Sequence, residues 1–439
     1  MNPKYTAIAV FVLVYVFLAI SKKYRARALW LGVLVMAVLG VYLREPGSLW
    51  HNAASTARQV FILIDWNVLG IFAGVLLVAE FFIITKVPVL LSDVLIDRSK
   101  NVGQAMLLVC ALSGLISMFV ENVATVLIVA PLALQISKRL KLSPVPFLIG
   151  IAISSNLQGT ATLVGDPPSM ILAAEMAMDF NQFFWYHGKP GIFFAVQIGA
   201  VCSMGVLWLF FRKYDQPTIY VEKEAVTSWV PTVLLAAMLA ALAATPALDH
   251  AGIRVPAGIT CMAFGAAAVV WSFVHSREET WKVFRDYDYR TVAFLAGVFA
   301  MVGALNLPQV GLVGDVTQML AGVIGHNRLL ALAVVVAFSL AFSAFIDNVP
   351  YITAMLPVTT ALAREWGNPD DPLIAFGLLI GSCIGGNITP IGASANIVSI
   401  GLLRREGHSV GFMEFAKIGL PFTIAATVPA AIFLWFVWG

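Results

Sequence analysis

Long apolar runs separated by short polar loops pattern this chain from end to end. A helix that crosses a bilayer needs about 20 predominantly apolar residues. The first half therefore predicts membrane helices over residues 5–21, 28–43, 60–83 and 190–211, and the second half shows a similar series. The first run has neither a basic stretch before it nor a small-residue cleavage pattern, so it is predicted to be a membrane helix rather than a signal peptide.

Two apolar segments have polar residues at their centre instead of at their ends. Each carries an acidic residue followed by asparagine: Glu121 and Asn122 in segment 103–137, and Asp347 and Asn348 in segment 329–362. The second arm of the first segment has about 15 residues and reaches about 22 Å, less than the roughly 30 Å hydrocarbon core. Two full spans would return the chain to the same side, so loop charge leaves both forms open. The arm length favours two re-entrant helical hairpins with buried polar tips.

Two further apolar stretches, 145–174 and 372–402, are interrupted by glycine, proline and threonine. Proline removes a backbone donor and glycine relaxes the backbone, so both helices are predicted to open at mid-length. Opened backbone at membrane depth must be buried in protein or line a wet cavity. Its carbonyls can bind a cation, and the N-terminus of the next half-helix favours an anion. One break alone could be a simple kink, but two matched breaks beside matched acidic tips favour a binding site.

An internal repeat relates the two halves of the chain. Residues 118–123 (MFVENV) match 344–349 (AFIDNV), and residues 159–165 (GTATLVG) match 386–392 (GNITPIG), at a nearly constant offset. Self-similarity on this scale indicates a duplicated structural unit.

Lysine and arginine gather in loops that fall on one side of the predicted topology. The basic segments are 22–27, 86–100, 138–141, 212–223, 277–290 and 404–405. The positive-inside rule places these loops in the cytoplasm, so both chain ends lie outside and the halves enter the membrane from opposite sides. We therefore predict an all-α polytopic protein of the inner (cytoplasmic) membrane with two inverted-topology repeats, a plan typical of secondary transporters. The predicted divisions are a first repeat (1–211), a cytoplasmic linker (212–228) and a second repeat (229–439).

The composition agrees with this interpretation. Hydrophobic residues make up 60% and charged residues 12% of the chain, and mean hydropathy is +0.89, whereas soluble domains are about 25% charged. The four cysteines stand singly, without a disulfide framework or metal-ligand spacing. The sequence contains no phosphate-binding loop, metal-ligand cluster or nucleophile–base arrangement. We therefore predict no enzyme, no catalytic residue, no cofactor and no nucleic-acid partner.

Carboxylates within the apolar segments are the main candidate functional groups. An ionised side chain at the bilayer centre is costly, so it usually serves transport or pairs with a partner. We expect Glu121 and Asp347 to handle a proton or cation; the alternative is that they only hold the hairpin turns. Asp166 either joins the site or caps the half-helix that follows it.

Three other acidic residues have simpler interpretations. Glu80 either exchanges a proton or lies near a helix end with its head group in water. Asp65 and Asp288 precede predicted helices and are expected to cap them.

These elements resemble the ion transporter superfamily, which includes divalent anion/sodium symporters, citrate transporters, arsenite permeases, sodium/proton antiporters and the melanosomal P protein. The resemblance covers almost the whole chain and is most specific at residues 119–125, 159–168 and 392–396. The second of these runs is similar to the P-protein and arsenite-permease-like branch, although Gln158 and Ser169 replace that branch's usual Gly and Asn. Membership implies a homodimer in which a mobile part moves against a scaffold as an elevator.

The resemblance implies that the hairpin tips and broken helices hold substrate and ions. The candidate site residues are Glu121, Asn122, Thr125, Asn156, Thr160, Thr162, Gly165, Asp166, Ser169, Asp347, Asn348, Asn387, Thr389, Gly392, Ser394 and Asn396. A sodium ion would use the tips, Glu121, Asn122, Asp347 and Asn348. In the dicarboxylate symporters the tips read Ser-Asn-Thr. Here acidic residues replace the serine, so proton coupling becomes credible and a dicarboxylate substrate is less expected.

The leading hypothesis is a secondary transporter that moves a small anion or oxyanion, coupled to H⁺ or Na⁺. A Na⁺/H⁺ antiporter that uses the tip carboxylates is the alternative. A passive anion channel is a third alternative, although a channel would usually show a pore-lining polar stripe or rings of charge, whereas this sequence shows two isolated polar sites at matched depth. The expected partners are a small anion or cation, the lipid bilayer and a second copy of the chain.

Overall fold

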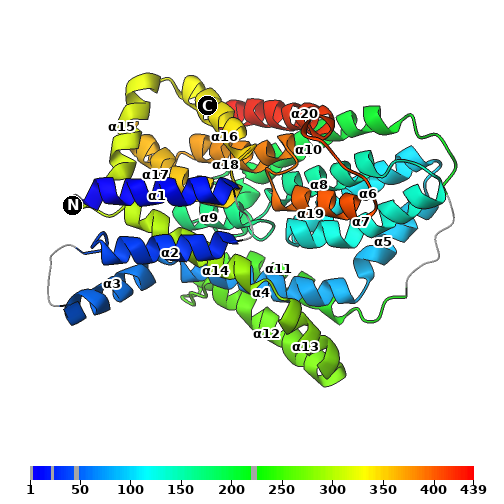
Figure 1. The fold of residues 1–439 in the computed structure, drawn as a ribbon, viewed down its shortest axis with the longest axis horizontal. Helices are drawn as coiled ribbons and strands as arrows, with labels where there is room; N and C mark the ends of the chain where they lie inside the picture. Colours follow the sequence, from blue (N-terminus) through cyan, green and yellow to red (C-terminus); the bar gives the residue numbers. More distant parts are fainter. Residues whose placement is uncertain (1–2, 21–23, 44–48, 219–224) are drawn as a thin grey trace.

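The computed structural model describes residues 3–20, 24–43, 49–218 and 225–439. Within these ranges 77% of the chain is helical, and the sheet structure is a two-stranded hairpin (Figure 1). The all-helical fold class predicted from the sequence is confirmed. Positions 21–23, Arg44 and part of the predicted linker (219–224) lie outside the described residues.

The elements in chain order are α1 (Pro3–Ile20), α2 (Arg25–Val38), α3 (Leu49–Leu63), α4 (Trp66–Ile84), α5 (Val87–Asp97), α6 (Val102–Ser117), α7 (Asn122–Arg139), α8 (Val145–Gly159), α9 (Pro167–Glu175), η2 (Asn181–Phe183), β1 (Trp185–Tyr186), β2 (Lys189–Pro190), α10 (Ile192–Phe211), α11 (Val230–His250), α12 (Ala257–His275), α13 (Arg277–Asp286), α14 (Tyr289–Leu305), α15 (Leu312–Ile324), α16 (Arg328–Ser343), α17 (Asn348–Glu365), α18 (Leu373–Gly385), η3 (Gly386–Ile388), α19 (Ser394–Arg405) and α20 (Phe412–Trp438).

Five described helices are long and apolar enough to cross a membrane: α4, α10, α11, α12 and α20. The pair α13 and α14, bent by 41°, would be a sixth if it forms one span. The predicted span 28–43 is wrong in its bounds, because α2 starts at Arg25 and ends at Val38 before a turn at Gly40, whose φ is +77°. Its 14 residues cover about 21 Å, less than the hydrocarbon core. Helix α2 is therefore too short to cross the bilayer alone.

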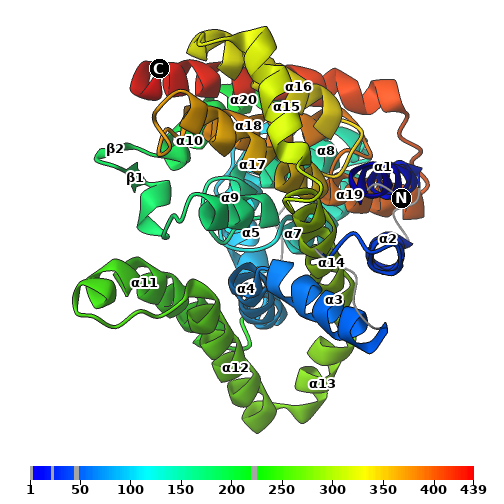
Figure 2. The same ribbon diagram turned by 90° about the vertical axis from the view of Figure 1, so that its left-hand side faces the viewer.

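Two helical hairpins approach the centre of the molecule from opposite ends. Helices α6 and α7 lie toward the right in Figure 1, whereas α16 and α17 lie toward the left. In the view from the left end, α15 and α16 are in front and α7 is behind them (Figure 2). In each hairpin the second helix begins just after the acidic residue, at Asn122 or Asn348. The hairpin tips therefore face each other inside the protein.

The two broken helices pack against the hairpins near these tips. Helices α8 and α9 are separated by residues 160–166, and α18 and α19 by a stretch that includes η3. Helix α19 of the second repeat packs against α7 and α8 of the first. In both repeats a threonine at the break donates a hydrogen bond to the hairpin turn: Thr162 to the Met118 carbonyl and Thr389 to the Ala344 carbonyl. The repeated sequence thus makes the same anchoring contact twice.

Glycines at the matched breaks fold the backbone tightly on itself. A Cβ at Gly165 would lie 2.4 Å from the Gly159 carbonyl oxygen, and a Cβ at Gly392 would lie 2.4 Å from that of Gly386. We expect Gly165→Ala and Gly392→Ala each to destabilise the protein by about 1–3 kcal/mol, because backbone atoms must move. Thermal unfolding in detergent measures this. Gly401→Ala is the matched control, since no atom lies within 4 Å of its Cβ; equal stability of all three variants would refute the packing argument.

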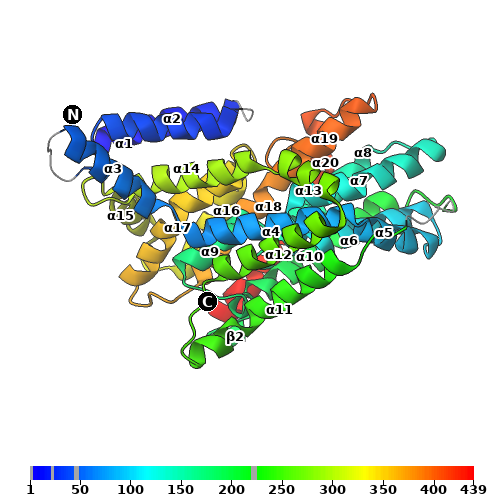
Figure 3. The ribbon, with the colours of Figure 1, turned by 90° about the horizontal axis from the view of Figure 1, so that it is seen from below.

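Helices outside the hairpins form the remainder of the protein. Helix α4 packs on α12, and α10 packs on α20. Small residues let these helices approach closely, since a Cβ at Gly74 would lie 2.3 Å from the Cys261 carbonyl carbon. Helices α11, α12 and α13 extend to one side of the molecule (Figures 2 and 3).

Candidate functional site

The hairpin tips and the starts of both second half-helices line one cavity of about 60 Å³. One water molecule needs about 10–15 Å³ on this measure, so the cavity has room for a small ion with a few waters. Its lining includes seven of the predicted site residues: Glu121, Asn122, Asn156, Asp166, Asp347, Asn348 and Ser394. It also includes three polar residues that the site prediction missed: Arg25, Asp288 and Thr291.

The first tip is held by hydrogen bonds within its own repeat. The Glu121 carboxylate accepts from the Ala124 N–H at 3.0 Å and so caps α7. The Asn122 side-chain oxygen accepts from the Ser117 hydroxyl at 2.6 Å. Ser155 on α8 donates to the Asn122 carbonyl at 3.2 Å. The asparagine is thus fixed in the tip, while Glu121 both caps the helix and faces the cavity.

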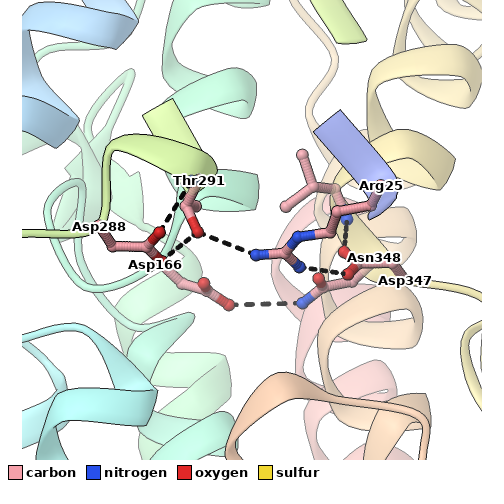
Figure 4. Close-up of polar contacts among 7 residues, drawn as sticks. Arg25, Asp166, Asp288, Thr291, Asp347 and Asn348 are labelled. Atoms are coloured by element: carbon pink, nitrogen blue, oxygen red, sulfur yellow. Dashed lines mark hydrogen bonds and ion pairs between the residues drawn. The ribbon is translucent and has the colours of Figure 1, made fainter. Parts of the chain in front are cut away.

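The second tip has an additional charged partner. One Asp347 carboxylate oxygen accepts from the Val349 N–H at 3.3 Å, and the other accepts from Arg25 Nη1 at 3.2 Å. Asn348 Nδ2 donates to the Asp166 carboxylate at 3.4 Å, which joins the second tip to the first broken helix (Figure 4). Both tip carboxylates therefore hold their hairpin turns, which is the alternative role considered for them, and both also line the cavity.

Arg25 is the feature that differs most from the sequence prediction, which placed it with the cytoplasmic loop charges. Its side chain is only 22% exposed. Besides Asp347, it donates to the Thr291 hydroxyl at 2.9 Å, and its guanidinium carbon lies 4.7 Å from the Phe294 ring centroid. Thr291 in turn donates to Asp288 (Figure 4). The sequence carries no signal for this role, because Arg25 stands among the basic residues of segment 22–27.

Asp166 does not cap the half-helix that follows it, so that alternative is wrong. Helix α9 begins with Pro167 and Pro168, which have no backbone N–H to donate. The next N–H, of Ser169, already bonds to the Asp166 carbonyl oxygen at 3.0 Å. The Asp166 carboxylate, in a residue only 6% exposed, instead faces Asn348 across the cavity.

Capping is confirmed for the two other acids that precede helices. Asp65 accepts from the Val68 N–H at 2.9 Å and caps α4. Asp288 accepts from the Thr291 N–H at 3.0 Å and caps α14. Asp288 also lines the cavity, whereas Glu80 on α4 is not among the lining residues.

Three buried asparagines connect the two broken helices behind the cavity. Asn156 Nδ2 donates to the side-chain oxygens of Asn387 at 2.8 Å and Asn396 at 2.9 Å. Asn396 Nδ2 donates to the carbonyls of Gly386 and Thr389, both at 2.9 Å. Of the three, only Asn156 reaches the cavity. Because Asn387 and Asn396 are fully buried and bonded within the protein, they support the site instead of lining it.

The remaining predicted residues also form a supporting layer around the cavity. The Thr125 hydroxyl donates to the Glu121 carbonyl at 3.2 Å, and Ser169 donates to the Thr160 carbonyl at 3.2 Å. Seven predicted site residues belong to this layer and do not line the cavity: Thr125, Thr160, Thr162, Gly165, Ser169, Thr389 and Gly392. Within the described residues, no group of three or more His, Cys, Asp or Glu side chains forms a preformed metal site.

Several apolar helices and two opposed hairpins that meet at a central cavity lined by charged residues are typical of membrane transporters. Comparison with known proteins identifies the group within that class: the chain belongs to the citrate transporter family, whose sequence model matches residues 15–380. The superfamily resemblance, and the prediction of a transporter rather than an enzyme, are confirmed.

Two relatives and one solved structure illustrate how far the similarity extends. An uncharacterized transporter of Mycobacterium tuberculosis is 28% identical over 445 residues, which cover 99% of both chains. The human P protein is 25% identical over 510 residues, covering 98% of this chain and 59% of the human one. The crystal structure of the Alcanivorax borkumensis YdaH transporter, described as having an unusual topology, superposes with a TM-score of 0.62 at 16% identity, over 99% of this chain and 98% of that one. The last comparison concerns the fold alone.

Proposed function

We propose that this protein is a secondary active transporter of a small anion, coupled to H⁺ or Na⁺ through alternating access. The observation that carries the proposal is the single cavity shared by two hairpin tips that reach it from opposite ends of the molecule. A site of this kind can be opened from either side by moving one hairpin at a time. Central sites between inverted repeats serve this purpose in many secondary transporters.

The charges around the cavity supply a mechanism for coupling. Four carboxylates line it, from Glu121, Asp166, Asp288 and Asp347, against one basic side chain among the described lining residues, Arg25. A bare anion would be repelled by this surplus of negative charge. Protons or sodium ions bound at the carboxylates would remove the repulsion, so cation and anion would each raise the affinity for the other.

The N-termini of two half-helices favour the anion. Pro167 at the start of α9 and Ser394 at the start of α19 line the cavity, with their helices directed away from it. The first turn of a helix carries partial positive charge and attracts anions. Arg25 adds a full positive charge beside them.

We place the protein in the inner membrane with both chain ends outside, on the basis of its basic loops. A homodimer with elevator motion of the hairpins and broken helices completes the proposal and rests on the family resemblance alone. A cysteine at Asn122 should then react with a membrane-impermeant maleimide from the cytoplasmic side, and a cysteine at Asn348 from the outside. Labelling of both positions from one side only would refute opposed entry of the hairpins.

A second candidate function is Na⁺/H⁺ antiport, which the excess of carboxylates in the cavity favours. Uptake into proteoliposomes under imposed proton and sodium gradients distinguishes the two functions. Citrate, succinate, sulfate and arsenite would be offered, with a pH-sensitive dye inside. Gradient-driven accumulation of an anion supports the main proposal, whereas sodium-driven pH recovery without anion uptake supports the antiporter. Absence of both activities would refute both.

A further inference from the structure

A second cavity, of about 530 Å³, lies next to the central one. It shares three lining residues with the central cavity: Arg25, Asp288 and Ser394. It adds Arg27 from the first turn of α2 and Arg290 from the first turn of α14. We call it the arginine vestibule, defined by these five residues. The shared residues form a common wall between the vestibule and the site at the hairpin tips.

The two cavities have opposite formal charge. The vestibule is lined by three arginines and one aspartate, whereas the central cavity is lined by four carboxylates and one arginine. Neighbouring regions of opposite potential sort ions of opposite sign. Cations are therefore favoured at the hairpin tips, and an anion with more than one negative charge is favoured in the vestibule.

The added arginines are available to a ligand. Arg27 and Arg290 are both exposed, and neither forms an ion pair with a described residue. Arg27 also contacts an aromatic ring, because its guanidinium carbon lies 5.8 Å from the Tyr24 ring centroid. A guanidinium binds a carboxylate or oxyanion through two parallel hydrogen bonds. Two unpaired guanidiniums in one cavity suit an anion with at least two such groups.

We propose that the arginine vestibule is the anion-binding subsite of this transporter, and that its ligand is a small soluble anion with two or more carboxylate or oxyanion groups. This inference rests on the proposed function. It keeps the anion away from Glu121, Asp166 and Asp347, because Arg27 and Arg290 hold it beside the cation-binding tips and outside them. The fourth carboxylate, Asp288, lines both cavities. Arg25, at the boundary, contacts Asp347 in this structure and turns to the anion once a cation neutralises Asp347.

A membrane lipid head group is the competing source of negative charge, since arginines at a bilayer surface also bind lipid phosphate. The vestibule adjoins the central cavity at Arg25, Asp288 and Ser394, which favours a transported anion instead. Binding of citrate and of phosphatidylglycerol by the same variants distinguishes the two sources.

Binding can be measured without any gradient, as the citrate-dependent rise in unfolding temperature of the purified full-length protein. We expect Arg27→Gln and Arg290→Gln each to weaken apparent citrate affinity about tenfold, the loss of one charge-assisted hydrogen bond. Arg285→Gln is the matched control, because Arg285 is 79% exposed on α13 and is not among the vestibule residues. Its citrate affinity should equal that of the wild type. Both tested arginines are exposed, so their loss should leave the fold intact.

Three results would overturn the proposal. The first is unchanged citrate affinity in the double variant. The second is a wild type that none of citrate, succinate, sulfate and arsenite stabilises. The third is measured in nanodiscs: phosphatidylglycerol stabilises the wild type but not the variant with both Arg27→Gln and Arg290→Gln, while the citrate affinity of that variant is unchanged. This result would make the vestibule a lipid-binding site. If the vestibule binds citrate but proteoliposomes transport nothing, the proposed function fails and the anion site stands.

Discussion

Replacing Glu121 with glutamine is expected to abolish ion-coupled accumulation while leaving the protein folded. Glutamine has nearly the same shape, and its side-chain oxygen can still accept from the Ala124 N–H that the carboxylate caps. It cannot take up a proton and offers no negative charge to a cation. We expect gradient-driven uptake to fall at least about 100-fold, because the coupling cation would lose its charged ligand in a desolvated site. Uptake into proteoliposomes under imposed proton or sodium gradients measures the loss.

Two controls separate coupling from folding in this experiment. Thermal unfolding of the Glu121→Gln variant should stay close to that of the wild type. Glu365→Gln makes the same chemical change at an exposed position near the end of α17 and should leave uptake unchanged. Normal uptake by the Glu121→Gln variant, with the same dependence on pH and sodium, would mean that the carboxylate only holds the turn.

The hairpins and broken helices could be predicted because membrane physics makes them visible in the sequence. Water is absent from the bilayer core, so Glu121 or Asp347 inside an apolar run must lie in a special environment. The paired glycines and prolines mark the breaks for the same reason. The second half repeats both signals, which removes most of the ambiguity that each would have alone.

The partners of these residues could not be predicted, because they depend on how distant helices pack. Arg25 looked like any basic residue of a cytoplasmic loop, since the positive-inside rule counts charges and takes no account of depth. Its contact with Asp347 joins residues 322 positions apart. Similarly, nothing local indicates that Asn387 and Asn396 bond to Asn156 instead of facing the cavity.

The Arg25–Asp347 pair also makes the two repeats chemically unequal. Both tips have an acidic residue in the same turn position, yet within the described residues only Asp347 has an arginine against it. In the proposed mechanism, Glu121 is therefore the tip carboxylate that is accessible to a coupling ion. Asp347 becomes accessible to a cation only when Arg25 moves away, so we expect the two tips to bind cations in a defined order.

Arg25→Gln is expected to destabilise the protein and to abolish transport, and a second substitution should reverse only the first effect. Removing one partner of a buried pair costs about 3–5 kcal/mol, and we expect about 2 kcal/mol here because both side chains are partly exposed. Asp347→Asn in the same chain removes the uncompensated charge. The double variant should therefore regain thermal stability but not uptake, because it restores neither the proposed anion-binding charge of Arg25 nor the proposed cation site at Asp347. Thermal unfolding and proteoliposome uptake of the single and double variants measure these two effects.

Arg25→Lys decides whether charge alone is sufficient at this position. Arg25 uses separate nitrogens for its two partners, Nη1 for Asp347 and Nη2 for Thr291. A lysine keeps the charge but has one nitrogen on a narrower head group and cannot reproduce the planar fork. We expect Arg25→Lys to unfold near the wild-type temperature and to transport poorly, because Thr291 and Asp288 lose their link to the second tip. Full activity of the lysine variant would show that Arg25 acts only as a counter-charge for Asp347.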